Sequence, residues 1–361
     1  MINRVLSYRF PGILPVILIV VVTIGASLGG FAGTLGAAPV VVTPSASPGA
    51  DTPVATPLSS VLSQSQLELA SQSLQAEIPT ILSNDTGVYG VVIVDPNGSI
   101  VYEHNADVPF ISASLYKLPL MAQIYSMIDA GSITLDQEIV LDESFFPGWD
   151  DVGDSYYSTD FMGASTSIEE ALFAAGAYSS NVGALALASL TTWADIEATA
   201  QSIGMTSTHL VVAPTSLAQW PPAQGASDDA SSLNQAVAFV ELFSMEDGTV
   251  MITTPRDIAT FFSMLLNGMV VSTGASAGIT SILKQQMVDD RFPQLLPEGT
   301  ELVHKTGNLE HVVHDAGTIY TTAGPVILAA LSEDTYDDSV ATWIIQELAR
   351  TTYETFSASS S

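Results

Sequence analysis

The stretch GVYGVVIVDPNGSIVYEHN, residues 87–105, carries the clearest fold signal in the sequence. Two β-rich runs, 87–95 and 99–105, flank Pro96-Asn97-Gly98, and such a turn between strand-like runs predicts a β-hairpin. Further β-rich runs follow late in the chain, at 300–307, 314–322 and 324–334. Two early and three late strands predict one five-stranded antiparallel sheet assembled from both ends of the domain.

Helical patterns surround and separate these strands. From Gln64 onward, apolar residues between Leu67 and Ile81 fall roughly on one helical face, and a final helix is expected at about 336–356. Between the early and late strands, helices are expected at 114–130, 167–177, 181–190, 194–203, 255–268 and 276–289. The predicted class is therefore α+β, a sheet flanked by terminal helices with an inserted, all-helical subdomain.

The charge balance excludes some functions. The chain has 361 residues, of which 38 are acidic and 8 basic, giving a formal net charge of −30. Nucleic-acid binding depends on Lys and Arg displacing counterions, so nucleic acid is not an expected partner. Cysteine is absent, which excludes thiol catalysis, disulfides and cysteine-ligated zinc.

The N-terminal region differs in composition from the rest of the chain. Residues 1–38 hold Arg4 and Arg9 before an apolar run, a pattern that predicts a membrane anchor with its N-terminus inside. The alternative is a signal peptide cleaved near Gly36. A Pro/Ser/Thr-rich linker is expected at 39–61, the main domain at 62–356 and a disordered tail at 357–361. On either interpretation the main domain lies outside the cytoplasm, membrane-anchored or secreted.

Lysine is rare in this chain, so the few lysines present are candidates for functional residues. Only Lys117, Lys284 and Lys305 occur in the whole chain. Ser114 precedes Lys117 by three positions, which places both side chains on one face if a helix starts at Ser114. A serine nucleophile needs a nearby base, and burial among the neighbouring apolar residues would lower the pKa of Lys117 enough to supply one. Taken alone, this S-x-x-K spacing also fits a helix cap beside an exposed lysine.

Two further short motifs follow in order. Ser179-Ser180-Asn181 lies where one helical run ends and the next begins, and Lys305-Thr306-Gly307 ends a predicted strand. Each alone fits an ordinary turn. In the second motif, Gly307 would allow a ligand to approach the backbone closely. Together the three motifs account for two of the three lysines, which favours a shared site.

With S-x-x-K, S-x-N and K-T-G in this order, the chain resembles the serine β-lactamase and penicillin-binding protein superfamily, and in particular class A β-lactamase-like domains. The stretches ASLYKLPLM, TTPRDIATFFSMLLNG and LLPEGTELVHKTG are also similar to class A sequences, and the resemblance covers about residues 64–355. It implies a five-stranded antiparallel sheet and an all-helical subdomain with the active site between them.

The resemblance also implies roles for individual residues. Ser114 is expected to be the acylated nucleophile and Lys117 its general base, while Ser179 passes a proton to the departing nitrogen beside Lys305. The residues expected to bind substrate, through side chains or the backbone N–H of an oxyanion hole, are Asn181, Thr306, Gly307 and Asn308. The implied substrate is a β-lactam or a cell-wall peptide, and a monomeric catalytic domain without cofactor or metal is expected.

One element of the class A pattern is missing. The family's E-x-x-L-N motif, whose glutamate activates the deacylating water, is not found, and Glu241 is the nearest carboxylate by position. Glu241 also fits an exposed charge on a short helix. Efficient hydrolysis of the acyl-enzyme is therefore an open question at this stage. The alternatives are a D,D-peptidase-like penicillin-binding protein or a non-catalytic module that binds β-lactams or peptidoglycan.

Two groups of polar residues could in principle bind a metal ion, but their sequence context favours other interpretations. His304, His314 and Asp315 are interpreted as strand residues, whose side chains alternate between faces. Asp150, Asp151 and Asp154 lack a calcium-loop signature and are interpreted as a solvated acidic turn.

Overall fold

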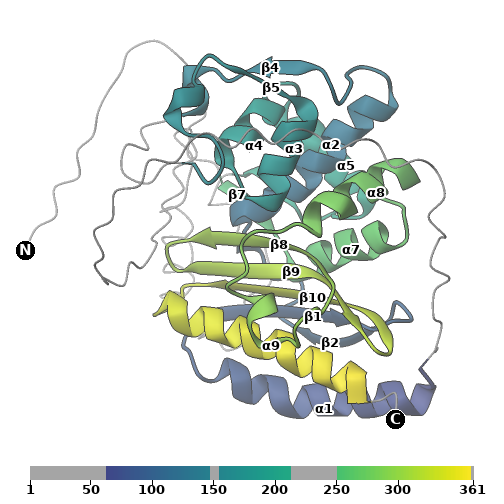
Figure 1. Cartoon of the computed structure of the whole chain (residues 1–361). Coiled ribbons are helices and arrows are strands. Elements are labelled where there is room, and N and C mark those ends of the chain that lie inside the picture. Colours follow the sequence, from purple (N-terminus) through teal and green to yellow (C-terminus); the bar gives the residue numbers. More distant parts are fainter. Residues whose placement is uncertain (1–61, 147–153, 213–249, 359–361) are drawn as a thin grey trace, which may run out of the picture.

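The computed structural model describes residues 62–146, 154–212 and 250–358 (Figure 1). Its main sheet has the strand order β2-β1-β10-β9-β8, and the paired neighbours are antiparallel. The strands are β1 (Val88–Val94), β2 (Ile100–His104), β8 (Leu302–Leu309), β9 (Val312–Thr321) and β10 (Gly324–Glu333). Pairing of β1 with β10 joins the early hairpin to the late strands, as predicted, and confirms the α+β class with a five-stranded antiparallel sheet.

The β1–β2 turn forms for the reason that its sequence indicates. Asp95 Oδ1 accepts hydrogen bonds from the backbone N–H groups of Asn97 and Ser99, at 2.7 and 2.9 Å. Gly98 adopts a φ of +84°, a left-handed conformation that costs glycine little. Local side-chain and backbone chemistry therefore closes the hairpin.

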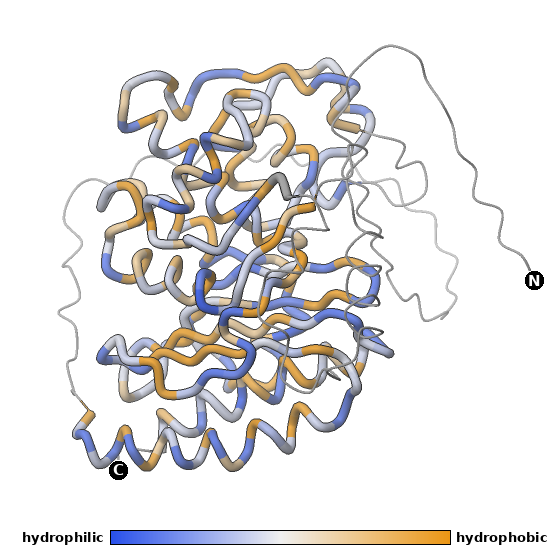
Figure 2. Tube along the Cα trace, turned by 180° about the vertical axis from the view of Figure 1, so that it is seen from behind, coloured by the Kyte–Doolittle hydropathy of each residue, from blue (hydrophilic) through white to orange (hydrophobic). Residues whose placement is uncertain are grey.

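One face of the sheet is covered by the two terminal helices, α1 (Gln64–Leu82) and α9 (Asp338–Ala358), which lie side by side (Figure 1). Figure 2 shows hydrophobic and hydrophilic residues alternating along α1, as expected for an outer helix. Strand β1 divides its side chains between two cores. Val91 and Ile93 belong to the core beneath α1 and α9, whereas Val92 and Val94 belong to the core on the opposite face.

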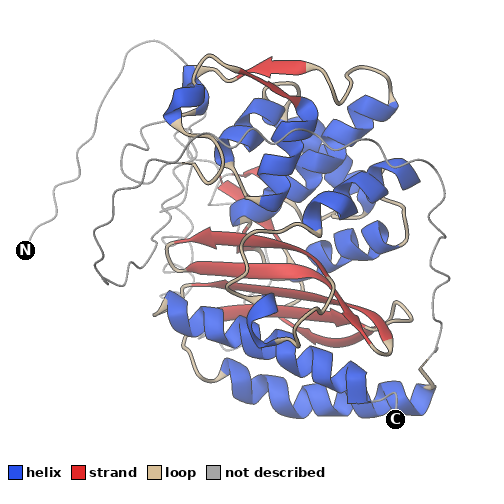
Figure 3. Cartoon of the chain, viewed as in Figure 1, coloured by secondary structure: helices blue, strands red, loops and turns tan. Residues whose placement is uncertain are grey.

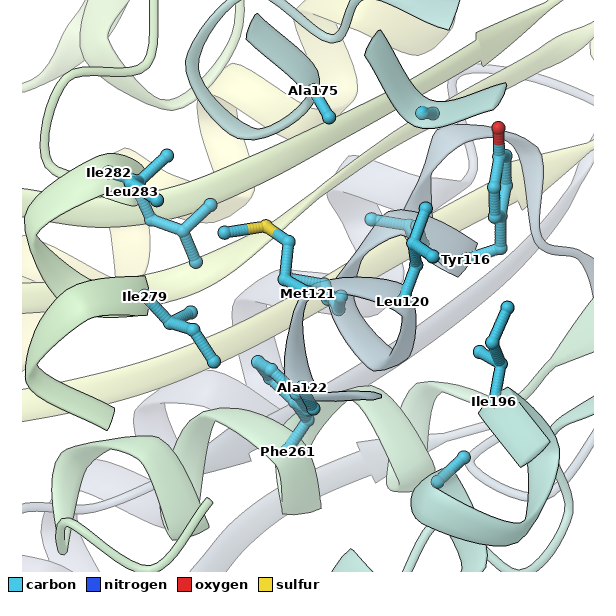
Figure 4. Packing of buried hydrophobic residues seen from close by; sticks show 14 of the residues in the cluster. Tyr116, Leu120, Met121, Ala122, Ala175, Ile196, Phe261, Ile279, Ile282 and Leu283 are labelled. Carbon is cyan, nitrogen blue, oxygen red and sulfur yellow. The ribbon is translucent and has the colours of Figure 1, made fainter. Parts of the chain in front are cut away.

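That second core continues into the helical subdomain. The helices that pack around this core are α2 (Lys117–Asp129), α3 (Ile168–Ala177), α4 (Asn181–Ala188), α5 (Trp193–Ile203), α7 (Pro255–Leu266) and α8 (Thr273–Leu283), of which α7 lies against β1, β9 and β10 of the sheet. Figure 4 shows Met121 and Ala122 of α2 among Phe261 of α7 and Ile279 and Ile282 of α8. Helix α2 is therefore surrounded by apolar neighbours, and its first residue, Lys117, is carried into a buried position.

Short elements complete the described chain (Figure 3). One small sheet has the order β3-β7-β6, and β4 pairs with β5 in another. These strands are β3 (Phe110–Ile111), β4 (Glu138–Val140), β5 (Ser165–Ser167), β6 (His209–Val212) and β7 (Val250–Thr253). The 3-10 turns are η1 (Ala113–Tyr116), η2 (Glu143–Phe145), η3 (Thr159–Phe161) and η5 (Phe292–Leu295). The sequence interpretation missed these small sheets, because strands of two to four residues are too short to show an alternating pattern.

Some predicted boundaries need correction. Helix α8 begins at Thr273, because Ser272 Oγ accepts a hydrogen bond from Ala275 N, and it ends at Leu283 rather than at 289. Helix α9 continues to Ala358, past the predicted start of the tail at 357. The predicted anchor at 1–38 and the predicted linker at 39–61 lie outside the described residues and stay predictions. Among the described helices, none combines the length and hydropathy needed to cross a bilayer.

Candidate active site

The small sheet leads the chain into the Ser114 turn. Ile111 of β3 pairs with Ile252 of β7, and Ser112 N then donates to Met251 O at 2.8 Å. Ser114 lies in the 3-10 turn η1, and the α-helix begins only at Lys117, which corrects the prediction of an α-helix from Ser114. A 3-10 turn has three residues per turn, so residues i and i+3 stand above one another. The S-x-x-K spacing is therefore realised by a tighter turn than expected.

Lys117 is enclosed by oxygen atoms in an otherwise apolar setting. Its Nζ lies 3.2 Å from Ser114 Oγ and donates to Asn181 Oδ1 at 2.8 Å and to the backbone oxygen of Ser179. The Lys117 side chain is fully buried. Burial lowers the pKa of Lys117 to about 7, against an opposing effect of the Asp154 charge. A large share of Lys117 is therefore a free amine near neutral pH, able to accept the proton of Ser114.

Ser179 links the helical subdomain to the sheet. It follows α3, has a φ of +59° and precedes the buried Ser180, whose Oγ caps α4 by accepting from Gly183 N at 2.9 Å. The Ser179 hydroxyl oxygen lies 3.4 Å from Lys117 Nζ and 2.9 Å from Lys305 Nζ. A non-glycine residue in the left-handed region is uncommon, and the surrounding contacts hold it there. The Ser179 hydroxyl therefore stands between two amines.

Lys305 reaches this hydroxyl from β8. Its side chain is fully buried, and its Nζ also donates to Thr306 O at 2.8 Å. Burial, and then the neighbouring Lys117 charge, lower the pKa of Lys305 well below its ordinary value. The hydrogen-bonded groups Ser114, Lys117, Ser179 and Lys305 thus form one continuous chain across the boundary between sheet and helices.

Gly307 has a steric role within the protein, while its predicted role in ligand approach stays a prediction. A Cβ at this position would lie 3.1 Å from His314 Cδ2 and 3.2 Å from Ala113 Cβ, tighter than most real contacts. The absent side chain lets β8 pass close to the Ser114 turn. His314 Nε2 in turn lies 2.8 Å from Ile111 O, which ties β9 to the segment before that turn. The two neighbours of Gly307 are therefore parts of the scaffold around Ser114.

Arg291 was missed by the sequence interpretation. It is 3% exposed and donates from Nη2 to Asn308 Oδ1, beside the K-T-G motif. With Lys117 and Lys305, three of the eight basic residues gather at this site. The scarcity of basic residues, arginine included, is the sequence signal that could have identified Arg291. The Arg291 guanidinium stays charged, and its positive charge favours an anionic group of a substrate.

The buried histidines and Asp315 act within the strands, as predicted. His304 Nδ1 lies 2.9 Å from Asp315 Oδ1, and Asp315 Oδ2 accepts from Phe292 N at 3.1 Å, next to Arg291. These contacts fix η5 against the sheet. No group of three metal-ligating side chains occurs within 62–146, 154–212 and 250–358.

The acidic candidates differ in outcome. Glu241, Asp150 and Asp151 lie outside the described residues, so the interpretations of these three stay predictions. Asp154 is described, and its carboxylate accepts five hydrogen bonds from protein groups, which contradicts the interpretation of a solvated turn. The sequence could not reveal this, because the donors to Asp154 include groups 26 to 28 positions away.

Several proteins of known structure share this architecture. The structure is similar to that of a β-lactamase from Sphaerobacter thermophilus, with 23% identity and a TM-score of 0.61, covering 82% of this chain and 98% of that one. It is also similar to a class A β-lactamase from Bacteroides cellulosilyticus (18% identity, TM-score 0.63, 80% and 99% covered). A third similar structure is PBP-A (18% identity, TM-score 0.60, 81% and 96% covered).

These likenesses show the fold. No curated protein matches the sequence. The sequence model described as "Beta-lactamase enzyme family" matches residues 73–356, a range that includes Ser114, Lys117, Ser179 and Lys305. The chain therefore belongs to the beta-lactamase enzyme family.

Proposed function

We propose that this protein is an active-site serine hydrolase that is acylated at Ser114 by β-lactams or related amides. The observation that carries the proposal is the continuous hydrogen-bonded chain from Ser114 through Lys117 and Ser179 to Lys305. A serine becomes a nucleophile when a neighbouring base takes its proton, and a buried lysine with a lowered pKa is such a base.

In the proposed reaction, Lys117 Nζ takes the Ser114 proton as Oγ attacks the carbonyl carbon. The resulting oxyanion is held by the backbone N–H groups of Ser114 and Asn308, each of which would contribute on the order of 3 kcal/mol. The carbon–nitrogen bond then breaks, and Ser179 delivers a proton to the departing nitrogen. The Ser179 proton is replaced from Lys117 or Lys305, both within hydrogen-bond distance. The acyl group stays on Ser114 Oγ.

Substrate binding follows from the charges at the same site. Lys305, Thr306 and Arg291 would receive a carboxylate of the substrate, and Asn181 would donate its side-chain amide N–H to a substrate carbonyl. We place the domain outside the cytoplasm, tethered by residues 1–38, because positive charge precedes an apolar run there.

A D,D-peptidase-like penicillin-binding protein is the second candidate. Two solved structures of PBP-A resemble this chain, and one of them, of a single-residue mutant, is an acyl-enzyme complex with penicillin G. Both candidates share the acylation step and differ in how fast water releases the acyl group. The third possibility, a non-catalytic binding module, would need neither a low-pKa Lys117 nor its contact with Ser114.

The test uses the full-length chain with a fluorescent penicillin and a chromogenic cephalosporin, comparing wild type with Ser114→Ala. We expect covalent labelling of the wild type and none of Ser114→Ala. The control Ser65→Ala, an exposed serine on α1, should label normally. Rapid colour change with little stable label would indicate a β-lactamase, and stable label without turnover a peptidase-like protein. A wild type that binds neither compound covalently would contradict the proposal.

A further inference from the structure

The Asp154 side chain, which is not part of α4, accepts hydrogen bonds from the first residues of that helix and from its N-cap, Ser180. Its Oδ2 accepts from the backbone N–H groups of Asn181 and Val182, at 2.7 and 3.0 Å. Its Oδ1 accepts from the Ser180 hydroxyl at 2.7 Å. Ser180 already caps the helix with its own side chain, so Asp154 adds a charged second cap. Both oxygens of one carboxylate are thus committed to the Ser179-Ser180-Asn181 motif.

The segment that carries Asp154 is fixed independently of these contacts. Ser155 Oγ donates to Tyr178 O at 2.7 Å, and the Tyr157 hydroxyl lies 2.9 Å from Thr166 Oγ1. The Tyr156 ring stands edge-on to the Tyr178 ring, with centroids 4.9 Å apart. Removing the Asp154 carboxylate would cost the segment the hydrogen bonds from Tyr156 N and Tyr157 N, but these side-chain contacts would still hold it on the helical subdomain.

A short path connects Asp154 to the base of the reaction. Asn181 donates its backbone N–H to Asp154 and accepts at Oδ1 from Lys117 Nζ, at 2.8 Å. The charged groups acting on Lys117 and its partner Lys305 come from several elements. Asp154 opposes the lowering of the Lys117 pKa. For Lys305, burial and then the Lys117 charge lower the pKa, Asp315 opposes this, and Arg291 lowers the pKa further.

Tyr116, which also lies close to Lys117, carries no charge. The Tyr116 ring centroid lies 5.8 Å from Lys117 Nζ, and burial raises the pKa of its hydroxyl, which stays neutral. Within the described residues, Asp154 is therefore the acidic group whose charge acts on the pKa of Lys117.

We propose that Asp154 is a positioning residue, which fixes Ser179 and Asn181 opposite Ser114 and supplies the negative charge that balances Lys117. The expected effect of Asp154 on the rate of acylation rests on the proposed function. Its expected effect on the titration of Lys117 does not. A carboxylate that serves only as a helix cap would stabilise α4 without acting on the titration of Lys117.

The first test reads that titration directly. Because the chain has three lysines, protein labelled with ¹³C at lysine Cε gives three signals, assigned with Lys284→Arg and Lys305→Arg. We expect Lys117 to titrate near pH 7 in the wild type and about one pH unit lower in Asp154→Asn, because the lost negative charge no longer stabilises the ammonium form. Asp154→Ser, which keeps a capping oxygen without charge, should shift it similarly.

The matched control is Asp160→Asn, which removes an equal charge from an exposed residue of η3. It should leave the Lys117 titration unchanged. An equal titration in wild type, Asp154→Asn and Asp154→Ser would overturn the proposal and leave Asp154 as a cap alone. Near-ultraviolet circular dichroism and the melting temperature establish that each variant is folded.

The second test measures the rate of labelling by fluorescent penicillin across pH. For Asp154→Asn we expect at least about a tenfold slower reaction at high pH, because Ser179 and Asn181 lose their support, and an acid limb moved to lower pH. A slower rate with an unmoved acid limb would count against the charge role. If the wild type is not labelled, the proposed function fails, while the lysine titration still decides the role of Asp154.

Discussion

At the residue scale, burial converts an ordinary lysine into a base. Lys117 and Lys305 are both fully buried, whereas Lys284 is partly exposed and pairs with Glu301 at 2.6 Å. Burial disfavours the charged form and lowers the pKa of the first two, whereas the hydrogen bond to Glu301 raises the pKa of Lys284. The same side chain therefore has opposite chemistry at the surface and in the site.

The pH dependence of acylation follows from Lys117. Protonated Lys117 cannot accept the Ser114 proton, so the rate of labelling should rise with pH, reach half its maximum near pH 7, and fall about tenfold per unit well below that. Lys117→Arg keeps the positive charge but cannot lose its proton, so labelling should drop by about 10² to 10⁴ above pH 7, with a smaller deficit at lower pH where Lys117 is itself protonated. Lys284→Arg is the control and should match the wild type. A flat profile in the wild type would exclude Lys117 as the base.

At the element scale, the close pairing of β8 with β9 places Lys305. The pair His304–Gly317 lies directly beside the pair Lys305–Ala316. A Cβ at position 317 would come within 2.3 Å of Val303 O, a backbone atom that cannot rotate aside. The glycine is therefore required by the separation of the two strands.

Gly317→Ala should push β8 away from β9 and destabilise the fold by about 2 to 3 kcal/mol. Because the displaced residues adjoin Lys305, labelling by penicillin should also slow in the folded fraction. Denaturant unfolding and labelling rates measure the two effects. Gly274→Ala in α8 is the control: its Cβ meets only Ser272 Oγ, at 3.7 Å, and alanine favours a helix by up to about 1 kcal/mol. Equal stability of the two variants would refute the steric account.

At the scale of the whole molecule, the acidic surface repels itself. The net charge is −30, yet three of the eight basic residues lie in the site, two of them fully buried. Like charges on a compact surface destabilise the folded state relative to the expanded chain, and salt screens that repulsion. The stability of this protein should therefore depend on ionic strength.

Raising NaCl from about 0.01 to 0.15 M shortens the screening length from about 30 to 8 Å. We expect the melting temperature to rise by several degrees over this range, measured by circular dichroism near neutral pH. At about pH 5 some carboxylates begin to protonate and the repulsion weakens, so the same salt series should give a smaller rise. A melting temperature that falls with salt at neutral pH would show that surface ion pairs outweigh the repulsion.

The sequence predicted those features whose causes are local. The turn chemistry of Pro96-Asn97-Gly98 indicated the hairpin, the β-rich runs indicated the five strands, and the S-x-x-K spacing placed Ser114 near Lys117. Each depends on residues within a few positions of one another. The order of the motifs then supported the family, and the strands and helices of the structure confirm the α+β class.

The tertiary structure alone decided which distant groups meet and which charges are buried. Lys305 reaches Ser179 across 126 positions, and Asp154, which looked like a solvated acid, binds the start of α4. Arg291 lies buried beside Asn308, although nothing around it in the sequence predicts burial. Burial and long-range contact depend on how the helical subdomain packs against the sheet, and this packing sets the pKa values on which the proposed chemistry rests.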